Sequence, residues 1–194
     1  MQKLKRDDLY TLEKYAEIRN DFRAQVMAHK KNRQLSIGPN ATLYFEDRMV
    51  MQYQIQEILR TEKIFEAEGI EEELEAYNPL IPDGSNWKAT FMIEFTEEAE
   101  RRVALTKMLG IEDKVWVQAE GYDKVYPIAD EDLERETETK TSSVHFLRFE
   151  LTAEMIQALK SGASLSAGIE HPAYTQTVSP VPQNIRDSLV SDLD

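Results

Sequence analysis

Hydrophobic positions in the N-terminal part of the chain recur every three or four residues, which is the period of a helix packed on one side. This pattern predicts helices over residues 7–29 and from about 48 to 68, followed by a short acidic helix over 71–77. Asp47 is the expected N-cap of the second helix, and Gly69 is expected to end that helix in a left-handed conformation.

A short β-hairpin is predicted between the first two helices. Residues 35–37 and 42–45 have the composition of strands and flank a run of turn-forming residues, Gly38-Pro39-Asn40. The segment 79–86 contains two prolines and a glycine, which disfavour helix and strand alike, so we expect a linker there. Residues 1–78 are therefore expected to form a helical segment with a hairpin.

Beyond the linker, the hydrophobic period changes to that of strands. We predict strands near residues 88–95, 115–118, 125–128, 144–151 and 164–170, and helices over 97–109, 152–160 and 182–193. This order indicates an α+β protein whose residues 87–175 form a mixed β-sheet with helices on one face, a ferredoxin-like or split βαβ plan. Residues 176–194 are a Pro- and Ser-rich tail with a short helix, and all parts could form one composite domain.

Composition excludes several kinds of site and partner. The 194 residues contain no cysteine, which rules out cysteine-ligated iron–sulfur clusters and leaves histidine and carboxylates as the strong metal ligands. The net charge of −13 argues against a nucleic-acid-binding surface, although residues 1–33 are mildly basic. The chain begins without an apolar leader and has no apolar run long enough to span a membrane, so we expect a cytoplasmic location.

A row of polar side chains follows one side of the second helix. Arg48, Gln52, Gln56 and Arg60 are spaced four residues apart, and Glu57 lies beside them. Two guanidinium groups and two amides in a line could bind a small anionic ligand, or they could dock a partner helix or another part of the same protein. A solvent-exposed face with favourable helix pairs explains the same row.

Two histidines and a glutamate are the candidate metal ligands. Strand alternation places His145 on a mostly apolar face with Leu147 and Phe149, where its ring nitrogens need partners. His171 ends a strand, and Glu62 falls within an apolar stripe of the second helix, where a carboxylate needs a cation, a metal or a proton. Together the three could form a two-histidine, one-carboxylate site for iron or manganese. A core histidine bonded to the backbone and a glutamate paired with a nearby Lys or Arg are the structural alternatives.

No catalytic or nucleotide-binding motif is recognisable in the chain. It lacks a Walker phosphate loop and the patterns GxGxxG, HExxH and GxSxG. No histidine follows a glutamate by three residues, so the paired Glu-x-x-His motif of ferritin-type di-iron sites is absent as well. The sequence therefore defines no reaction and no oligomeric state.

Five sequence blocks, PNATLYFEDR, QYQIQEILRTE, AYNPLIPDGSN, KTSSVHFLRFEL and GIEHPAY, occur in this order along the chain. Through them the chain resembles, over about residues 3–175, a family of bacterial proteins of unknown function, and the tail lies outside this resemblance. Genes of that family often lie beside genes for rubrerythrin-like di-iron proteins and iron–sulfur oxidoreductase subunits. The resemblance thus implies a non-catalytic accessory or partner protein in redox or peroxide defence. The residues themselves leave a small non-haem metal-binding protein or metalloenzyme, and a small-anion binding protein, as alternatives.

Overall fold

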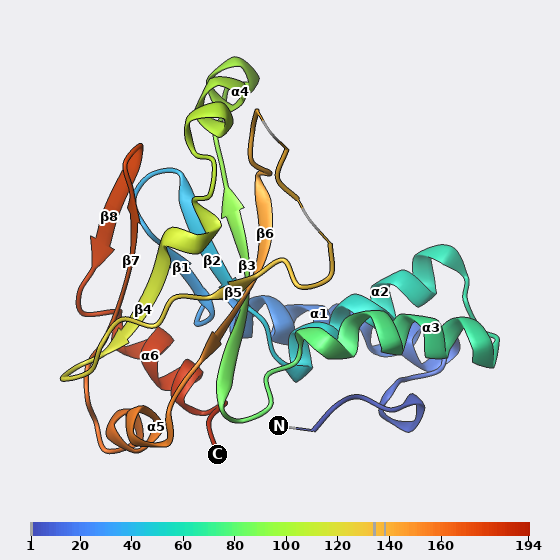
Figure 1. Ribbon diagram of the computed structural model, residues 1–194. Helices are drawn as coiled ribbons and strands as arrows, with labels where there is room; N and C mark the ends of the chain where they lie inside the picture. The colour runs from blue at the N-terminus through green and yellow to red at the C-terminus, as the bar shows by residue number, and fades with distance from the viewer. Residues whose placement is uncertain (1, 134, 138) are drawn as a thin grey trace.

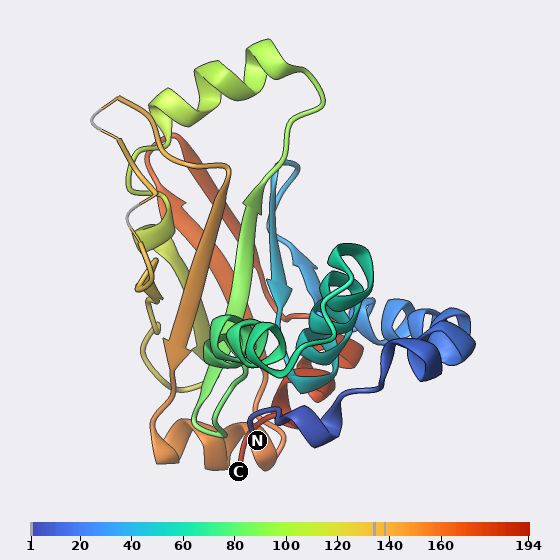
Figure 2. The same ribbon diagram turned by 90° about the vertical axis from the view of Figure 1, so that its right-hand side faces the viewer.

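Two antiparallel β-sheets lie face to face, and three helices form a further layer beside the larger sheet (Figures 1 and 2). The structure is a computed structural model that describes residues 2–133, 135–137 and 139–194. The larger sheet contains, in spatial order, β1 (Gln34–Ser36), β2 (Ala41–Phe45), β3 (Asn86–Ile93), β6 (Val144–Glu150) and β5 (Ile128–Ala129). The smaller sheet contains β4 (Val115–Ala119), β7 (Leu165–His171) and β8 (Tyr174–Val178). The helical layer consists of α1 (Leu12–Lys30), α2 (Arg48–Glu62) and α3 (Ala67–Tyr77).

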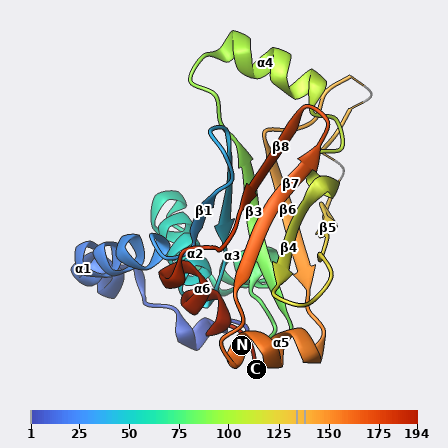
Figure 3. The same cartoon turned by 90° about the vertical axis from the view of Figure 1, so that its left-hand side faces the viewer.

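The α+β class is confirmed, but the predicted single mixed sheet does not form. Every strand pair between the described residues is antiparallel, and β4 leaves the larger sheet to pair with β7. Figure 3 shows the smaller sheet in front of the larger one. A ferredoxin-like plan needs helices packed on one face of the sheet, whereas α4 (Glu98–Lys107) buries none of its residues and lies across one end of the sheets. The helices α5 (Ala153–Lys160) and α6 (Gln183–Val190) lie at the opposite end.

The main hydrophobic core fills the space between the two sheets. Trp87, Phe91 and Phe149 extend into it from the larger sheet, and Val117 and Ile169 extend into it from the smaller one, all of them buried. Along β3 and β6 these residues alternate with less buried ones, as expected for a sheet with one face in the core. A second hydrophobic cluster lies in the helical layer and contains Val50, Met51, Ile55 and Leu59 of α2.

Contacts cross all the boundaries between the predicted segments. The hairpin strand β2 pairs with β3 on the far side of residues 79–86, with Leu43 opposite Phe91. In the tail, Leu189 of α6 is buried in the main core, and its carbonyl oxygen accepts a 2.8 Å hydrogen bond from Nε1 of Trp87. The division into segments 1–78, 87–175 and 176–194 stays a prediction, and these contacts favour the alternative of one composite domain.

The predicted start of the first helix and the predicted end of the second are wrong. The first helix begins at Leu12 with Thr11 as its N-cap, because residues Arg6–Asp8 form a separate 3-10 turn. The second helix ends at Glu62, because Lys63 takes the left-handed conformation with φ 57°. Gly69 lies inside α3, where a Cβ atom would come within 2.8 Å of Cγ2 of Ile64. This glycine therefore allows close packing and does not end a helix.

Two strand predictions also need correction. Of the strand expected over residues 125–128, the structure forms the two-residue strand β5 and a single bridge between Val125 and Val117. The strand β8 was not expected, because Tyr174–Val178 lies at the start of the Pro- and Ser-rich region. Among the described residues, no helix has both the length and the apolar character needed to cross a membrane.

Candidate functional site

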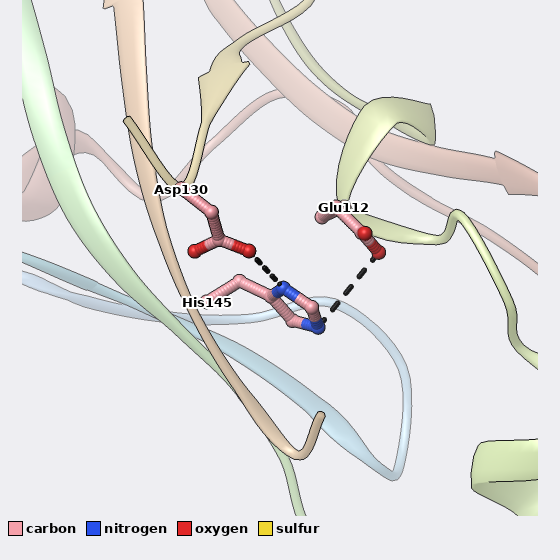
Figure 4. A group of neighbouring side chains, drawn as sticks. All are labelled: Glu112, Asp130 and His145. Atoms are coloured by element: carbon pink, nitrogen blue, oxygen red, sulfur yellow. Dashed lines mark hydrogen bonds and ion pairs between the residues drawn. The ribbon is translucent and has the colours of Figure 1, made fainter. Parts of the chain in front are cut away.

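Three ionisable side chains from different parts of the chain meet between the two sheets (Figure 4). His145 lies in β6, on the inward face of the larger sheet, and Asp130 directly follows β5. Glu112 is in the short 3-10 helix η3 (Glu112–Lys114), which leads into β4 of the smaller sheet. One potential ligand atom from each residue lies within 4.8 Å of the other two. In the part of the chain that the structure describes, this is the one such group of His, Asp and Glu residues.

Asp130 fixes the orientation of the buried imidazole. The ring of His145 is 0% exposed, and its Nδ1 lies 2.6 Å from Oδ2 of Asp130. A carboxylate only accepts hydrogen bonds, so Nδ1 carries the hydrogen. The other oxygen of Asp130 accepts hydrogen bonds from the backbone N–H of Phe146 at 2.9 Å and from Nη1 of Arg135 at 3.2 Å. Asp130 also has a left-handed backbone with φ 49°, an uncommon conformation that often occurs at functional sites.

The second ring nitrogen faces only oxygen atoms. Nε2 of His145 lies 3.0 Å from Oγ1 of Thr141, 3.1 Å from the carbonyl oxygen of Ser142 and 3.7 Å from Oε2 of Glu112. The last distance is too long for a hydrogen bond. It is, however, a separation that one metal ion can bridge, because metal–nitrogen and metal–oxygen bonds in such sites are about 2.0–2.2 Å long.

The electrostatics of the group favour a cation. Glu112 is 8% exposed, and burial raises the pKa of its carboxyl group because the charged form loses its water. Oγ1 of Thr141 lies 3.4 Å from Oε2 of Glu112, so a second oxygen ligand is within reach of the same position. With Nδ1 bonded to Asp130, the lone pair of Nε2 can accept a hydrogen bond from the Thr141 hydroxyl or bind a metal ion together with Glu112.

Of the three predicted metal ligands, the structure brings only His145 into this group. Nε2 of His171 donates to the carbonyl oxygen of Leu109 at 2.9 Å, and its Nδ1 accepts from the backbone N–H of Ala173 at 3.1 Å, so both nitrogens are used locally. Glu62 is exposed at the last position of α2. The expectation that Glu62 lies in a buried apolar stripe is wrong, because the helix ends at this residue.

The predicted polar row on α2 holds the N-terminal segment of the same chain. Nη2 of Arg48 pairs with Oδ1 of Asp8 at 2.8 Å, and Nε2 of Gln52 donates to the Asp8 carbonyl oxygen at 2.7 Å. The buried amide of Gln56 accepts from the backbone N–H of Tyr10 at 2.6 Å and donates to its carbonyl oxygen at 3.3 Å. The row therefore docks another segment, as one of the sequence alternatives expected, and that segment is the N-terminal part of the same chain.

The same helix is joined to α1 through Glu57. Its carboxylate accepts from the Tyr15 hydroxyl at 2.6 Å and from Nε and Nη2 of Arg19 at 2.8 and 2.7 Å. Arg60, the last member of the row, is exposed. Binding of a small anion or of a partner on this row therefore stays a prediction, with most of its side chains already engaged within the protein.

Sequence reasoning missed Glu112, Asp130 and Thr141. The chain has 36 Asp and Glu residues, and nothing in the local pattern distinguishes Glu112 and Asp130 from the rest. Their proximity to His145 follows from the pairing of β5 with β6 and from the packing of the smaller sheet on the larger one. The left-handed backbone of Asp130, which Asp tolerates better than most residues, is a signal that appears only in the structure.

Comparisons with known proteins give a family but no activity. A search of curated proteins found no match. The chain is similar to a protein of known crystal structure from Burkholderia pseudomallei, described as a novel protein of unknown function, with 52% identity, a TM-score of 0.92 and full coverage of both chains. A family model described as "Protein of unknown function (DUF3501)" matches residues 3–193, so the match includes the tail that the sequence resemblance left out. The chain therefore belongs to the DUF3501 family, a bacterial domain of unknown function, as the resemblance implied.

Proposed function

We propose that this protein binds a divalent transition metal ion between its two sheets, through Nε2 of His145 and the carboxylate of Glu112. The observation that supports this most is the 3.7 Å gap between these two atoms inside a buried, oxygen-rich environment. Thr141 Oγ1 and the Ser142 carbonyl oxygen, at 3.0 and 3.1 Å from Nε2, are further ligands on the same side of the ring. Asp130 is the outer partner that orients the ring, an arrangement common at metal-binding histidines.

The donor set favours manganese or iron. One imidazole nitrogen with several oxygen donors is intermediate between the oxygen-only sites of magnesium or calcium and the nitrogen- and sulfur-rich sites of zinc or copper. No cysteine is present in the sequence to shift this preference towards softer metals. Fe²⁺ and Mn²⁺ are therefore the ions that we expect the site to take.

The burial of the site favours a role other than substrate turnover. His145 is 0% exposed, Thr141 is 2% exposed and Glu112 is 8% exposed. Catalytic metal sites keep an open coordination position for water or substrate, whereas structural sites are closed by protein ligands. We therefore propose a metal that holds the two sheets together, in a protein without catalytic activity of its own at this site.

Elemental analysis combined with calorimetric titration tests this function. Protein purified without added metal, and then titrated with Mn²⁺ or with Fe²⁺ under anaerobic conditions, is expected to bind one ion per chain. His145→Gln is expected to abolish this binding, because the amide lacks the basic nitrogen. Glu112→Gln is expected to weaken it by about ten- to a hundredfold. Thermal unfolding of each metal-free variant checks that it is folded.

His29→Gln is the matched control. His29 also faces an aspartate, with Nε2 2.5 Å from Oδ2 of Asp47, but it lies outside the proposed site. Its replacement is expected to leave metal binding unchanged. Absence of stoichiometric metal together with absence of binding in the titration would contradict the proposal, and the group would then be a buried hydrogen-bonded cluster without a metal. Equal loss in both histidine variants would contradict it as well.

The sequence resemblance also implies a redox role, and we propose it as a more specific function than metal binding alone. A bound iron or manganese ion is compatible with an accessory protein that acts beside rubrerythrin-like or iron–sulfur proteins. Pull-down of those proteins at low and moderate salt tests this role, and clean absence of association would contradict it. A cytoplasmic location stays a prediction.

A further inference from the structure

A cavity of about 500 Å³ lies between the helical layer and the outer face of the larger sheet. Tyr77 of α3 and Leu80 form one wall, and Phe146 of β6 forms part of the other. This volume is within the range of about 300–1,000 Å³ that is usual for small-molecule sites. The cavity is separate from the proposed metal site, because Phe146 points to the outer face of β6 whereas its neighbour His145 points inwards.

One side of the cavity carries a buried carboxyl group. Glu46 is 5% exposed, and its Oε1 accepts a 2.7 Å hydrogen bond from Oγ1 of Thr90. Burial raises the pKa of Glu46, which favours the protonated form. A protonated carboxyl group can donate a hydrogen bond as well as accept one. The cavity therefore combines apolar walls with a buried carboxyl group on one side.

Ion pairs engage most of the charged side chains at the opening. Arg148 pairs with Glu131 and Glu150, while Asp132 pairs with Arg135. These ion pairs leave Lys88 as the lining cation to be explained.

Lys88 is the lining cation that lies outside these ion pairs. Its ammonium group donates to the carbonyl oxygen of Pro79, and it forms no ion pair with a carboxylate of the described residues. Burial lowers the pKa of Lys88, because its ammonium group is partly removed from water, and the charges of Asp83 and Glu131 offset this effect only in part. An incoming anion would supply the missing partner.

We propose that this cavity binds a small organic acid, with its carboxylate at Lys88 and its apolar body between Tyr77, Leu80 and Phe146. A charge-assisted hydrogen bond to the ammonium group would fix the acid end, and burial of the hydrocarbon part would supply most of the affinity. An amine of the same shape would meet Lys88 with like charge. A larger polyanion such as a nucleotide would need several unpaired cations, which the described lining does not offer. This inference is independent of the proposed metal site.

Calorimetric titration of the full chain with octanoate, octylamine and octanol tests the proposal. Octanoate is expected to bind at one saturable site, octanol more weakly, and octylamine without measurable affinity. Lys88→Met keeps the hydrocarbon stem but removes the charge, and is expected to weaken octanoate binding by about tenfold or more. Lys88→Arg is expected to restore most of it.

Two further variants separate binding in the cavity from a general effect of charge or stability. Ala76→Trp places a large ring on the cavity wall and is expected to weaken octanoate and octanol alike. Lys31→Met removes an exposed lysine at the end of α1 and is expected to change nothing. Octanoate without a saturable site, octylamine that binds as well as octanoate, or full octanoate affinity in a folded Lys88→Met variant would each overturn the proposal.

Discussion

A single carboxylate, that of Glu57, joins α1 to α2 through two partners at once. It receives both nitrogens of the Arg19 fork and the Tyr15 hydroxyl, and its side chain is 24% exposed. Glu57→Gln keeps the size of the side chain but leaves the guanidinium group without its charge partner. We expect the free energy of unfolding, measured by urea denaturation at about pH 7, to fall by about 1–3 kcal/mol.

The pH dependence of this effect has a definite sign. The hydrogen bond from Arg19 lowers the pKa of Glu57 below the ordinary value of about 4.3. An acid whose pKa is lowered in the folded state stabilises the protein above its unfolded pKa, and the stabilisation is lost as pH falls through the folded pKa. The difference between wild type and Glu57→Gln should therefore be full at about pH 7 and shrink on acidification below about pH 4. Glu75→Gln, at an exposed position on α3, should show no such difference. A difference that stays constant with pH would contradict the assignment.

Residue patterns predicted part of the candidate site and missed the rest for a physical reason. Alternation along β6 placed His145 correctly on the inward face, because side-chain direction in a strand is a local property. Glu112 and Asp130 could not be found in the same way, since their approach to the ring depends on which strands pair and which sheet they enter. Glu62 was misjudged because one left-handed residue, Lys63, ends the helix just after it.

Among the secondary-structure elements, α6 shows how a segment that looks peripheral in the sequence can be part of the core. Leu189 is 0% exposed and packs in the main cluster between the sheets. Leu189→Ala should lower the free energy of unfolding by about 2–5 kcal/mol, because it removes buried methyl groups and leaves a cavity. Leu133→Ala is the matched control, since Leu133 is 58% exposed and the chemical change is the same. Urea denaturation measures both, and equal small effects would show that α6 is not integral to the core.

The limits of sequence reasoning at this level follow from the range of the interactions. Helix caps and turns are local, so the hairpin, α5 and the tail helix were predicted close to their observed positions. Strand partners are not local: β2 pairs with β3 across the predicted linker, and β4 pairs with β7 in a second sheet. No hydrophobic period in either strand distinguishes one partner from another, and the mixed-sheet plan was wrong for this reason.

At the scale of the whole molecule, the proposed metal and the proposed acid should stabilise the protein independently. A ligand that binds only the folded state adds about 2.7 kcal/mol at a hundred times its Kd, which corresponds to a rise in Tm of roughly 5–11 °C for a chain of this size. Mn²⁺ should raise the Tm of wild type and of Lys88→Met but not that of His145→Gln. Octanoate should raise the Tm of wild type and of His145→Gln but not that of Lys88→Met.

This crossed pattern is more informative than either ligand alone. The metal would join Glu112, which leads into the smaller sheet, to His145 in the larger one, so it resists separation of the two sheets. The acid would join α3 to the outer face of β3 and β6, so it resists separation of the helical layer. If the protein unfolds in one cooperative step, both ligands raise the same Tm and their effects on the free energy of unfolding add. If octanoate instead shifts an earlier transition that Mn²⁺ leaves in place, the helical layer unfolds as a separate unit. The predicted division of the chain near residues 79–86 would then mark the boundary between two folding units, even though the β2–β3 hydrogen bonds cross that boundary.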